Sequence, residues 1–342
     1  MPQVSRVAVI LAGGSGERFW PLSTPERPKQ LLKLSGANRT LLEEALDRAD
    51  PVFTRDNVFI ATGPNIGPAV VRSGLLPPNH IFIEPSPKNT LGAICWAVAQ
   101  LRAQGYPDET TMAVLTADHA IGDIKEFGET VQAAMTLAEH TAGLVTIGIR
   151  PTRPETGYGY IQCGDPAGAG FTVGRFAEKP SADIANTYLD SGDYLWNSGM
   201  FFWTLAAFES ELRLHVPEAA ALLNRLASDP AAFGQLPSVA VDRALMERSD
   251  RIYVVPARFS WDDVGSWDSL WRTNEVDERG NVLVGAAIEV DSSDCIVYSD
   301  QIPVGALGVR DLIIVATPQG VLVCHKSEAQ RVREIVAKLK SP

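Results

Sequence analysis

Strand-like and helix-like segments alternate through the first 150 residues, and this alternation restricts the fold more than any other feature of the sequence. The strand-like segments are short, apolar and rich in β-branched residues, which is typical of strands buried on both faces. They lie at 7–12, 57–62, 81–84, 112–116 and 144–149. Helix-length stretches separate them at 40–49, 90–104 and 126–140. This spacing predicts a mostly parallel, Rossmann-like α/β sheet with helices on both faces.

Two of these helices carry start signals. Thr40 and Glu43 have the Thr-x-x-Glu spacing of a capping box, and Asn89 is a candidate cap for the helix at 90–104.

The segments after residue 150 are shorter and less regular. Short strands are expected around Tyr160 and Phe176, an aromatic run occupies 199–203, and helices are expected at 181–191, 205–215 and 218–227. Residues 281–323 are rich in Val and Ile with turn residues at short intervals, and a charged helix follows at 328–340. The sequence therefore predicts a main domain at 1–276 and a small C-terminal β module with a closing helix at 277–342.

The charge balance excludes two classes of function. Thirty Lys and Arg against 41 Asp and Glu give a net charge of −11. Nucleic-acid and anionic-membrane surfaces need clustered positive charge, so we expect neither partner. No apolar run approaches the roughly 18 residues of a transmembrane helix, and the apolar stretch at 7–12 is followed by glycines rather than a signal-peptide cleavage site. These features favour a cytoplasmic protein.

Four cysteines lie far apart in the sequence and form no CxxC pair. This spacing is typical of buried thiols in a reducing compartment, rather than of a disulfide framework or a zinc site. They are Cys95, Cys163, Cys295 and Cys324.

A glycine-rich loop follows the first strand directly, in the segment 11–22 with the letters LAGGSGERFWPL. Glycines let the backbone approach a ligand, and open α/β sheets bind ligands beyond the carboxyl ends of their strands. The loop is neither a P-loop nor a GxGxxG dinucleotide fingerprint, which argues against an NAD-dependent dehydrogenase. Four cations, Arg18, Arg27, Lys29 and Lys33, lie within sixteen residues of this acidic chain. They predict a phosphate-bearing ligand.

The loop and the Pro28-Lys29-Gln30 segment resemble the signature of sugar-1-phosphate nucleotidyltransferases. Their sequence is similar to that of the mannose-1-phosphate guanylyltransferase branch of this family. The resemblance continues in order along nearly the whole chain. It is carried by Glu84-Pro85, Asn89-Thr90, Asp118-His119, Glu178-Lys179-Pro180, Trp196-Asn-Ser-Gly199 and Trp261-Asp-Asp-Val-Gly-Ser-Trp267. It implies the nucleotidyltransferase fold for residues 1–276, in the short form without a fused isomerase domain.

Nucleotidyl transfer needs a cation that neutralises phosphate charge, and carboxylates are the ligands that Mg²⁺ prefers. Asp118 follows the predicted strand at 112–116, and so lies at the same sheet edge as the glycine loop. The resemblance implies Asp118 and Asp263, rather than Asp262, as the metal pair. Arg18 and Lys29 are expected to stabilise the nucleotide phosphates and the leaving group. We interpret His119 as structural, because a sugar 1-phosphate is already an anionic nucleophile.

The remaining expected site residues fall into two groups. The nucleotide-binding group comprises Leu11, Ala12, Gly13, Gly14, Ser15, Gly16, Glu84, Asn89 and Thr90. The sugar-phosphate-binding group comprises Gly159, Glu178, Lys179 and Asn197. Within the first group, the Glu84 carboxylate could accept the N1–H and N2–H₂ donors of guanine. The usual family sequence near Glu84 has Gly-Arg before Asn-Thr, whereas this chain has Pro87-Lys88 at those two positions.

The resemblance implies a Mg²⁺-dependent enzyme that joins mannose 1-phosphate to the guanylyl group of GTP. Two alternatives stay open. The same chemistry could act on another pair, such as glucose 1-phosphate with dTTP or UTP, because one hydroxyl separates such substrates. The chain could instead be a catalytically silent regulatory subunit that binds a sugar nucleotide. The apolar residues of the C-terminal module fit either a self-contained core or a homodimer surface.

Overall fold

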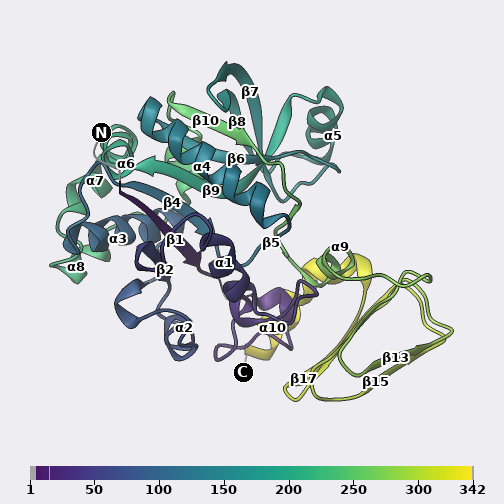
Figure 1. The fold of residues 1–342 in the computed structure, drawn as a ribbon. Helices are drawn as coiled ribbons and strands as arrows, with labels where there is room; N and C mark the ends of the chain where they lie inside the picture. Colours follow the sequence, from purple (N-terminus) through teal and green to yellow (C-terminus); the bar gives the residue numbers. More distant parts are fainter. Residues whose placement is uncertain (1–4, 15, 341–342) are drawn as a thin grey trace.

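A nine-stranded sheet forms the centre of the larger part of the molecule in the computed structural model, which describes residues 5–14 and 16–340 (Figure 1). The strand order is β3-β2-β1-β4-β9-β6-β10-β8-β7. The bounds are β1 (Arg6–Ala12), β2 (Val58–Thr62), β3 (Ile81–Ile83), β4 (Thr111–Thr116), β6 (Leu144–Ile149), β7 (Gly159–Ala167), β8 (Gly170–Glu178), β9 (Tyr194–Thr204) and β10 (Ile252–Pro256). Only β8 and β9 of these nine run against the others. The predicted mostly parallel α/β fold is confirmed.

Helices cover both faces of the sheet because successive strand residues point to opposite sides. Val7 and Val9 of β1 pack in one core with α3, α6 and α7, whereas Ala8 and Ile10 pack in a second core with α1 and α4. The helix bounds are α1 (Leu41–Ala49), α2 (Gly67–Arg72), α3 (Asn89–Ala103), α4 (Ile124–Thr141), α5 (Ala182–Ser191), α6 (Leu205–His215), α7 (Pro217–Leu223) and α8 (Pro230–Phe233).

One of the two predicted helix caps is present. The capping box of α1 is confirmed, because the Thr40 hydroxyl accepts from the Glu43 backbone N–H and the Glu43 carboxylate accepts from the Thr40 N–H. The prediction for Asn89 is wrong. Asn89 is already the first residue of α3, with φ +59°, and its Oδ1 accepts from the neighbouring Thr90 N–H.

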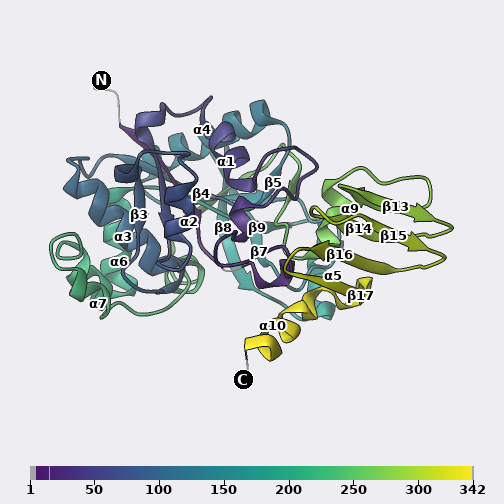
Figure 2. The same cartoon turned by 90° about the horizontal axis from the view of Figure 1, so that it is seen from below.

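The C-terminal segment forms a separate β module (Figure 2). Strands β12, β14 and β16 run parallel with β17 antiparallel at the edge, and β13 pairs in parallel with β15. The bounds are β12 (Val282–Val284), β13 (Ala287–Val290), β14 (Ile296–Ser299), β15 (Val304–Leu307), β16 (Leu312–Thr317), β17 (Gly320–His325) and the closing helix α10 (Val332–Lys340). The predicted boundary at 276/277 falls between α9 (Leu270–Thr273) and β12, and it stays a prediction.

Short elements connect these larger ones. A two-stranded ribbon pairs β5 (Ala120–Ile121) with β11 (Trp261–Asp262). A five-residue π-helix, η5 (Asp242–Met246), precedes β10. The 3-10 helices are η1 (Glu17–Phe19), η2 (Lys29–Leu31), η3 (Arg55–Asn57), η4 (Pro78–His80), η6 (Trp267–Ser269) and η7 (Lys326–Arg331).

The C-terminal module packs directly on the segment that follows the glycine-rich loop. Trp267 is fully buried between them, with its ring centroid 5.2 Å from that of Phe19 and 5.3 Å from that of Tyr298. Its indole N–H donates to the Trp20 carbonyl at 3.1 Å. In Figure 1 the yellow helix α10 lies beside the purple N-terminal segment. The loop and the module therefore share one hydrophobic core.

The structure bears on the expectations about the cysteines and about membrane-spanning helices. All four cysteines are free thiols, but only Cys95 and Cys295 are buried, so the expectation of burial is wrong for Cys163 and Cys324. None of the described helices combines the length and apolar character needed to cross a bilayer.

We expect Trp267→Phe to lower the free energy of unfolding by about 1–3 kcal/mol, because it removes a buried hydrogen bond and part of a fully buried ring. Urea denaturation measures this change. Trp271→Phe is the matched control, since Trp271 also donates to a carbonyl, that of Gly280, but is partly exposed. Equal losses in the two variants would contradict a special role for Trp267.

Candidate active site

The glycine-rich loop and Asp118 meet at the carboxyl edge of the sheet. The loop leaves β1 and Asp118 leaves the neighbouring β4, and the Ala117 N–H donates to the Leu11 carbonyl at 3.1 Å. The ribbon that pairs Ala120 with Asp262 then places Asp263 beside Asp118. Together they border a cavity of about 420 Å³. Its lining residues are Gly13, Gly14, Gly16, Glu17, Arg18, Phe19, Lys29, Asp118, His119, Asp263, Gly265 and Arg333.

Lys29 connects the two aspartates. Its buried ammonium lies 2.8 Å from Asp118 Oδ2 and donates to the Asp263 carbonyl oxygen at 3.0 Å. Burial by itself would raise the pKa of Asp118, but the charge of Lys29 and its hydrogen bond hold that pKa below its usual value. Asp118 is therefore an anion at neutral pH.

Tyr158 is a site residue that the sequence analysis missed. Its hydroxyl donates to Asp263 Oδ1 at 2.6 Å, and its ring contacts Trp196 and Trp261. Burial and the neighbouring Asp263 raise the pKa of Tyr158, so it remains a donor. Tyr158 lies in the Gly-Tyr-Gly-Tyr stretch that already drew attention to Gly159, and this position was its only signal in the sequence.

His119 is held as a neutral ring. Its Nδ1 accepts from the Trp261 indole N–H at 3.1 Å. Burial lowers the pKa of His119, although Asp118 opposes this effect. These contacts fit the interpretation that His119 has a structural role and does not act as a general base.

Gln30, a second residue that the sequence analysis did not select, holds the glycine-rich loop in place. It is fully buried, and its Nε2 donates to the Gly13 carbonyl at 2.6 Å. Gly16 has φ +64°, and a Cβ there would lie 2.5 Å from the Lys29 Cβ, so only glycine fits. The predicted Ser15 lies outside the described residues. The signal for Gln30 was its place in the Pro28-Lys29-Gln30 motif.

The other predicted nucleotide residues do not line this cavity. Leu11 and Ala12 belong to β1, where the Ala12 carbonyl accepts from the Thr62 hydroxyl at 2.8 Å. Glu84 lies at the same sheet edge, just after β3. Its Oε2 is buried without a hydrogen-bond partner among the described residues, and burial raises its pKa to about 7. The Thr90 hydroxyl accepts from the Val241 N–H at 2.8 Å, which is a structural contact.

The predicted sugar-phosphate residues form a second group at one end of β7, β8 and β9. A Cβ on Gly159 would lie 2.6 Å from Glu178 Oε2 and 3.4 Å from the Asn197 Cβ, so the three residues meet. Lys179 makes an exposed ion pair with Glu178 at 2.8 Å. The Asn197 amide donates to Asp242 Oδ1 at 2.7 Å, and burial together with Glu178 raises the pKa of Asp242 to about 6. Asp242, on the π-helix, was not predicted.

Comparison with known proteins agrees with this geometry. A family model described as nucleotidyl transferase matches residues 7–280, and a model described as MannoseP isomerase/GMP-like beta-helix domain matches residues 285–339. The chain belongs to the nucleotidyl transferase family. It is thus an enzyme of sugar-phosphate nucleotidyl transfer, as the resemblance of its motifs implied.

Three similar proteins cover almost the whole of this nucleotidyltransferase. It is 38% identical to a mannose-1-phosphate guanylyltransferase of Klebsiella pneumoniae and 39% identical to the xanthan biosynthesis protein XanB of Xanthomonas campestris pv. campestris (strain B100). Each alignment covers 97% of this chain and 73% of the relative. The crystal structure of a protein described as mannose-1-phosphate geranyltransferase from Thermus thermophilus has a TM-score of 0.91 and 35% identity. That match covers 99% of this chain and all of the other.

Only two of the four clustered cations of this nucleotidyltransferase reach the cavity. Arg18 and Lys29 line it. Arg27 instead makes an ion pair with Asp300 of the C-terminal module at 2.6 Å, and Lys33 donates to Asn38 on the surface. The expectation that one phosphate ligand explains all four is therefore wrong, because two of them have partners elsewhere.

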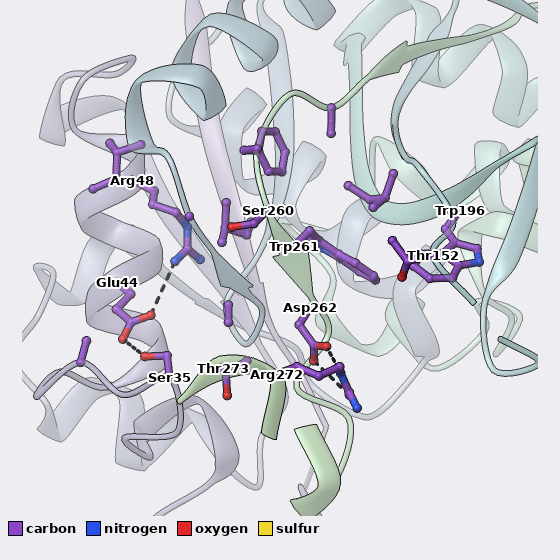
Figure 3. A pocket seen from close by; sticks show the side chains of 18 of the residues that line it. Ser35, Glu44, Arg48, Thr152, Trp196, Ser260, Trp261, Asp262, Arg272 and Thr273 are labelled. Atoms are coloured by element: carbon purple, nitrogen blue, oxygen red, sulfur yellow. Dashed lines mark hydrogen bonds and ion pairs between the residues drawn. The ribbon is translucent and has the colours of Figure 1, made fainter. Parts of the chain in front are cut away.

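A second cavity, of about 730 Å³, is lined by residues of α1, of the β5–β11 ribbon and of the segment that follows β6, and Figure 3 shows its lining. Asp262 faces this cavity, where Arg272 makes an ion pair with it at 2.5 Å and the Val264 N–H donates to it at 2.8 Å. Asp263 points to the smaller cavity instead. The two adjacent carboxylates thus have separate partners, and Asp262 supports the turn that carries Asp263.

We expect Tyr158→Phe to lower kcat about 10-fold, because Asp263 loses the donor that fixes its carboxylate. The thermal unfolding midpoint checks that the fold is intact. Tyr253→Phe serves as the control, since no described residue hydrogen-bonds to the Tyr253 hydroxyl. Equal kcat values for Tyr158→Phe and the unaltered enzyme would show that Asp263 does not need this contact.

Proposed function

We propose that this enzyme transfers the guanylyl group of GTP to α-D-mannose 1-phosphate, giving GDP-mannose and pyrophosphate. The observation that carries the proposal is that Asp118 and Asp263 line one cavity with the glycine-rich loop, and that Lys29 contacts both of them. The names of the similar proteins from Klebsiella pneumoniae and other bacteria support the choice of mannose 1-phosphate and of the guanylyl group.

The reaction needs no covalent intermediate with the protein. An oxygen of the sugar phosphate forms a bond to the α-phosphorus of GTP, and the bond from that phosphorus to the oxygen bridging to the β-phosphate breaks. Pyrophosphate leaves with the electron pair. The protein supplies position and charge: backbone N–H groups of the glycine loop, Arg18 and Lys29 hold the phosphates in line with the nucleophile.

Mg²⁺ is the proposed metal, and Asp118 and Asp263 are the residues that would hold it. Two carboxylates are a suitable donor set, because Mg²⁺ takes its other ligands from water and substrate phosphates. Among the described residues no larger cluster of His, Cys, Asp and Glu competes for a metal. When bound, the ion neutralises charge on the phosphate oxygens.

Glu84 is the proposed reader of guanine. Its unpartnered Oε2 is buried at the sheet edge, and Gly63 lies beside the other carboxylate oxygen, where a Cβ would make an ordinary van der Waals contact at 3.8 Å. A buried polar atom without a partner costs free energy, and a ligand donor removes that cost. Guanine presents two adjacent donors, N1–H and N2–H₂, which match both oxygens of one carboxylate.

The group formed by Glu178, Asn197 and Asp242 is the proposed binding site for the sugar. Carboxylates and a side-chain amide accept hydrogen bonds from hydroxyls, and Gly159 allows the ring to approach the backbone. Lys179 beside them is the proposed partner of the sugar phosphate.

Pyrophosphate release with Mg²⁺ tests the function, with five nucleoside triphosphates crossed with the 1-phosphates of mannose, glucose and N-acetylglucosamine. We expect the highest kcat/KM for GTP with mannose 1-phosphate. A maximum with another pair would retain the chemistry and overturn the assignment of the two substrates. Folded protein that releases no pyrophosphate with any pair would instead support a regulatory subunit.

The variant Asp118→Asn tests the metal assignment. We expect it to lower kcat at least about 10²- to 10³-fold, because one of two proposed metal ligands loses its charge. Asp123→Asn is the matched control, an exposed residue five positions along the chain. Turnover of Asp118→Asn at the rate of the unaltered enzyme would show that Asp118 does not hold the metal.

Glu84 also gives GTP binding a dependence on pH. Guanine binds the ionised carboxylate, and burial raises the pKa of Glu84 to about 7, so protonation weakens binding as the pH falls below 7. We expect the dissociation constant for GTP to rise about 10-fold between pH 8 and pH 6. Calorimetry on Glu84→Gln at the same pH values isolates this effect, since GTP itself titrates equally in both experiments. Parallel pH profiles in the two proteins would contradict the role of Glu84.

A further inference from the structure

Arg333 is the one described residue of the C-terminal helix that lines the candidate active site. Its side chain is exposed, and it makes no hydrogen bond or ion pair with the described residues. The preceding Arg331 is different, because two carboxylates, Glu328 and Glu334, pair with it at 2.7 and 2.9 Å. Arg333 therefore lines the cavity without an ion pair to any described carboxylate, and the adjacent Glu334, on which its charge acts, is already paired with Arg331.

The helix that carries Arg333 is fixed to the site by several contacts. Gln330 accepts from Arg18 Nη1 at 2.9 Å and donates to the Ser266 hydroxyl at 2.8 Å. At the far end of α10, Lys340 makes an ion pair with Glu17 at 2.6 Å. Val332 is buried in the core that the module shares with the glycine-rich loop. Arg333 thus has a defined place relative to the loop.

The cations that line the cavity differ in their partners. Lys29 already has an anionic partner, Asp118, whereas Arg18 has only the neutral amide of Gln330 among the described residues. Gln330 and Arg333 are three residues apart on continuous helical structure, so their side chains share a face. Arg18 and Arg333 thus line one cavity, and the helical face that carries Arg333 also carries the hydrogen-bond partner of Arg18. Two guanidinium groups that line one cavity, neither of them hydrogen-bonded to a described carboxylate, are suited to a multiply charged phosphate group.

We propose that Arg333 binds the β- and γ-phosphates of the nucleoside triphosphate together with Arg18, and so holds the pyrophosphate that leaves. The C-terminal module then completes the active site rather than only covering it. This inference rests on the proposed function, because it assumes that a nucleoside triphosphate occupies the cavity. Arg333 had no signal in the sequence, since it belongs to none of the motifs and lies 315 positions after Arg18.

Binding measurements test the inference without turnover. Calorimetry with GTP, pyrophosphate and GMP, each without sugar phosphate, separates the phosphates that Arg333 contacts from those that it does not. We expect Arg333→Ala to weaken the binding of GTP and of pyrophosphate about 10- to 100-fold, which is the usual effect of a lost charge-assisted hydrogen bond, and to change GMP binding less than about 2-fold. Arg333→Lys should restore part of the loss.

Arg331→Ala is the matched control, because it removes the same side chain from the same helical segment, where it faces Glu328 and Glu334. We expect its affinities to equal those of the unaltered enzyme. Kinetics give a second readout: in Arg333→Ala the KM for pyrophosphate in the reverse reaction should rise, while the KM for the nucleotide sugar stays constant.

Three results would overturn the inference. Normal GTP binding by Arg333→Ala would exclude the contact, and equal losses for GMP and GTP would assign Arg333 a structural role in the loop. An unaltered enzyme that neither binds any nucleoside triphosphate nor releases pyrophosphate would overturn the proposed function, and this inference with it. An active enzyme with an unaffected Arg333→Ala variant overturns the inference alone.

Discussion

The contact of the Lys29 ammonium with Asp118 and with the Asp263 carbonyl is the interaction on which the site depends. It joins three distant parts of the chain: the segment after the glycine-rich loop, the end of β4 and the turn after β11. Lys29 neutralises the Asp118 carboxylate directly, whereas its contact with Asp263 is to the backbone carbonyl and leaves the Asp263 carboxylate to Tyr158. Because Lys29 is almost fully buried, its charge acts where water screens it poorly.

The C-terminal module also stabilises the glycine-rich loop and the segment that follows it. Tyr298 of the module packs against Trp267 in the shared core, and Asp300 of the module pairs with Arg27. A glycine-rich loop loses much conformational entropy when it becomes ordered, so it needs such external contacts. Gln30 supplies another from within the larger part of the chain. The module is thus part of what fixes the loop.

The candidate site has two halves with different chemistry. Arg18, Lys29 and Arg333 gather where phosphates are expected, whereas Glu178 and Asp242 gather with Asn197 where sugar hydroxyls are expected. Under the proposed function, this separation matches cations to the phosphates of the substrates and acceptors to the hydroxyl donors of the sugar. It also explains why an acidic chain with a net charge of −11 can bind an anionic substrate, because the positive charge is local.

The sequence by itself determined the alternating α/β fold, the capping box of α1, the family and the motifs that supply Arg18, Lys29, Asp118 and Asp263. These features are local, since apolar periodicity and motif spacing are properties of short segments. Only the tertiary structure decided which charged residues meet. In the folded chain Arg27 pairs with Asp300, and Asp262 and Asp263 have different partners. Tyr158 and Arg333 lie at the candidate site. Strand order and packing between distant segments set those contacts, and no spacing along the chain encodes them.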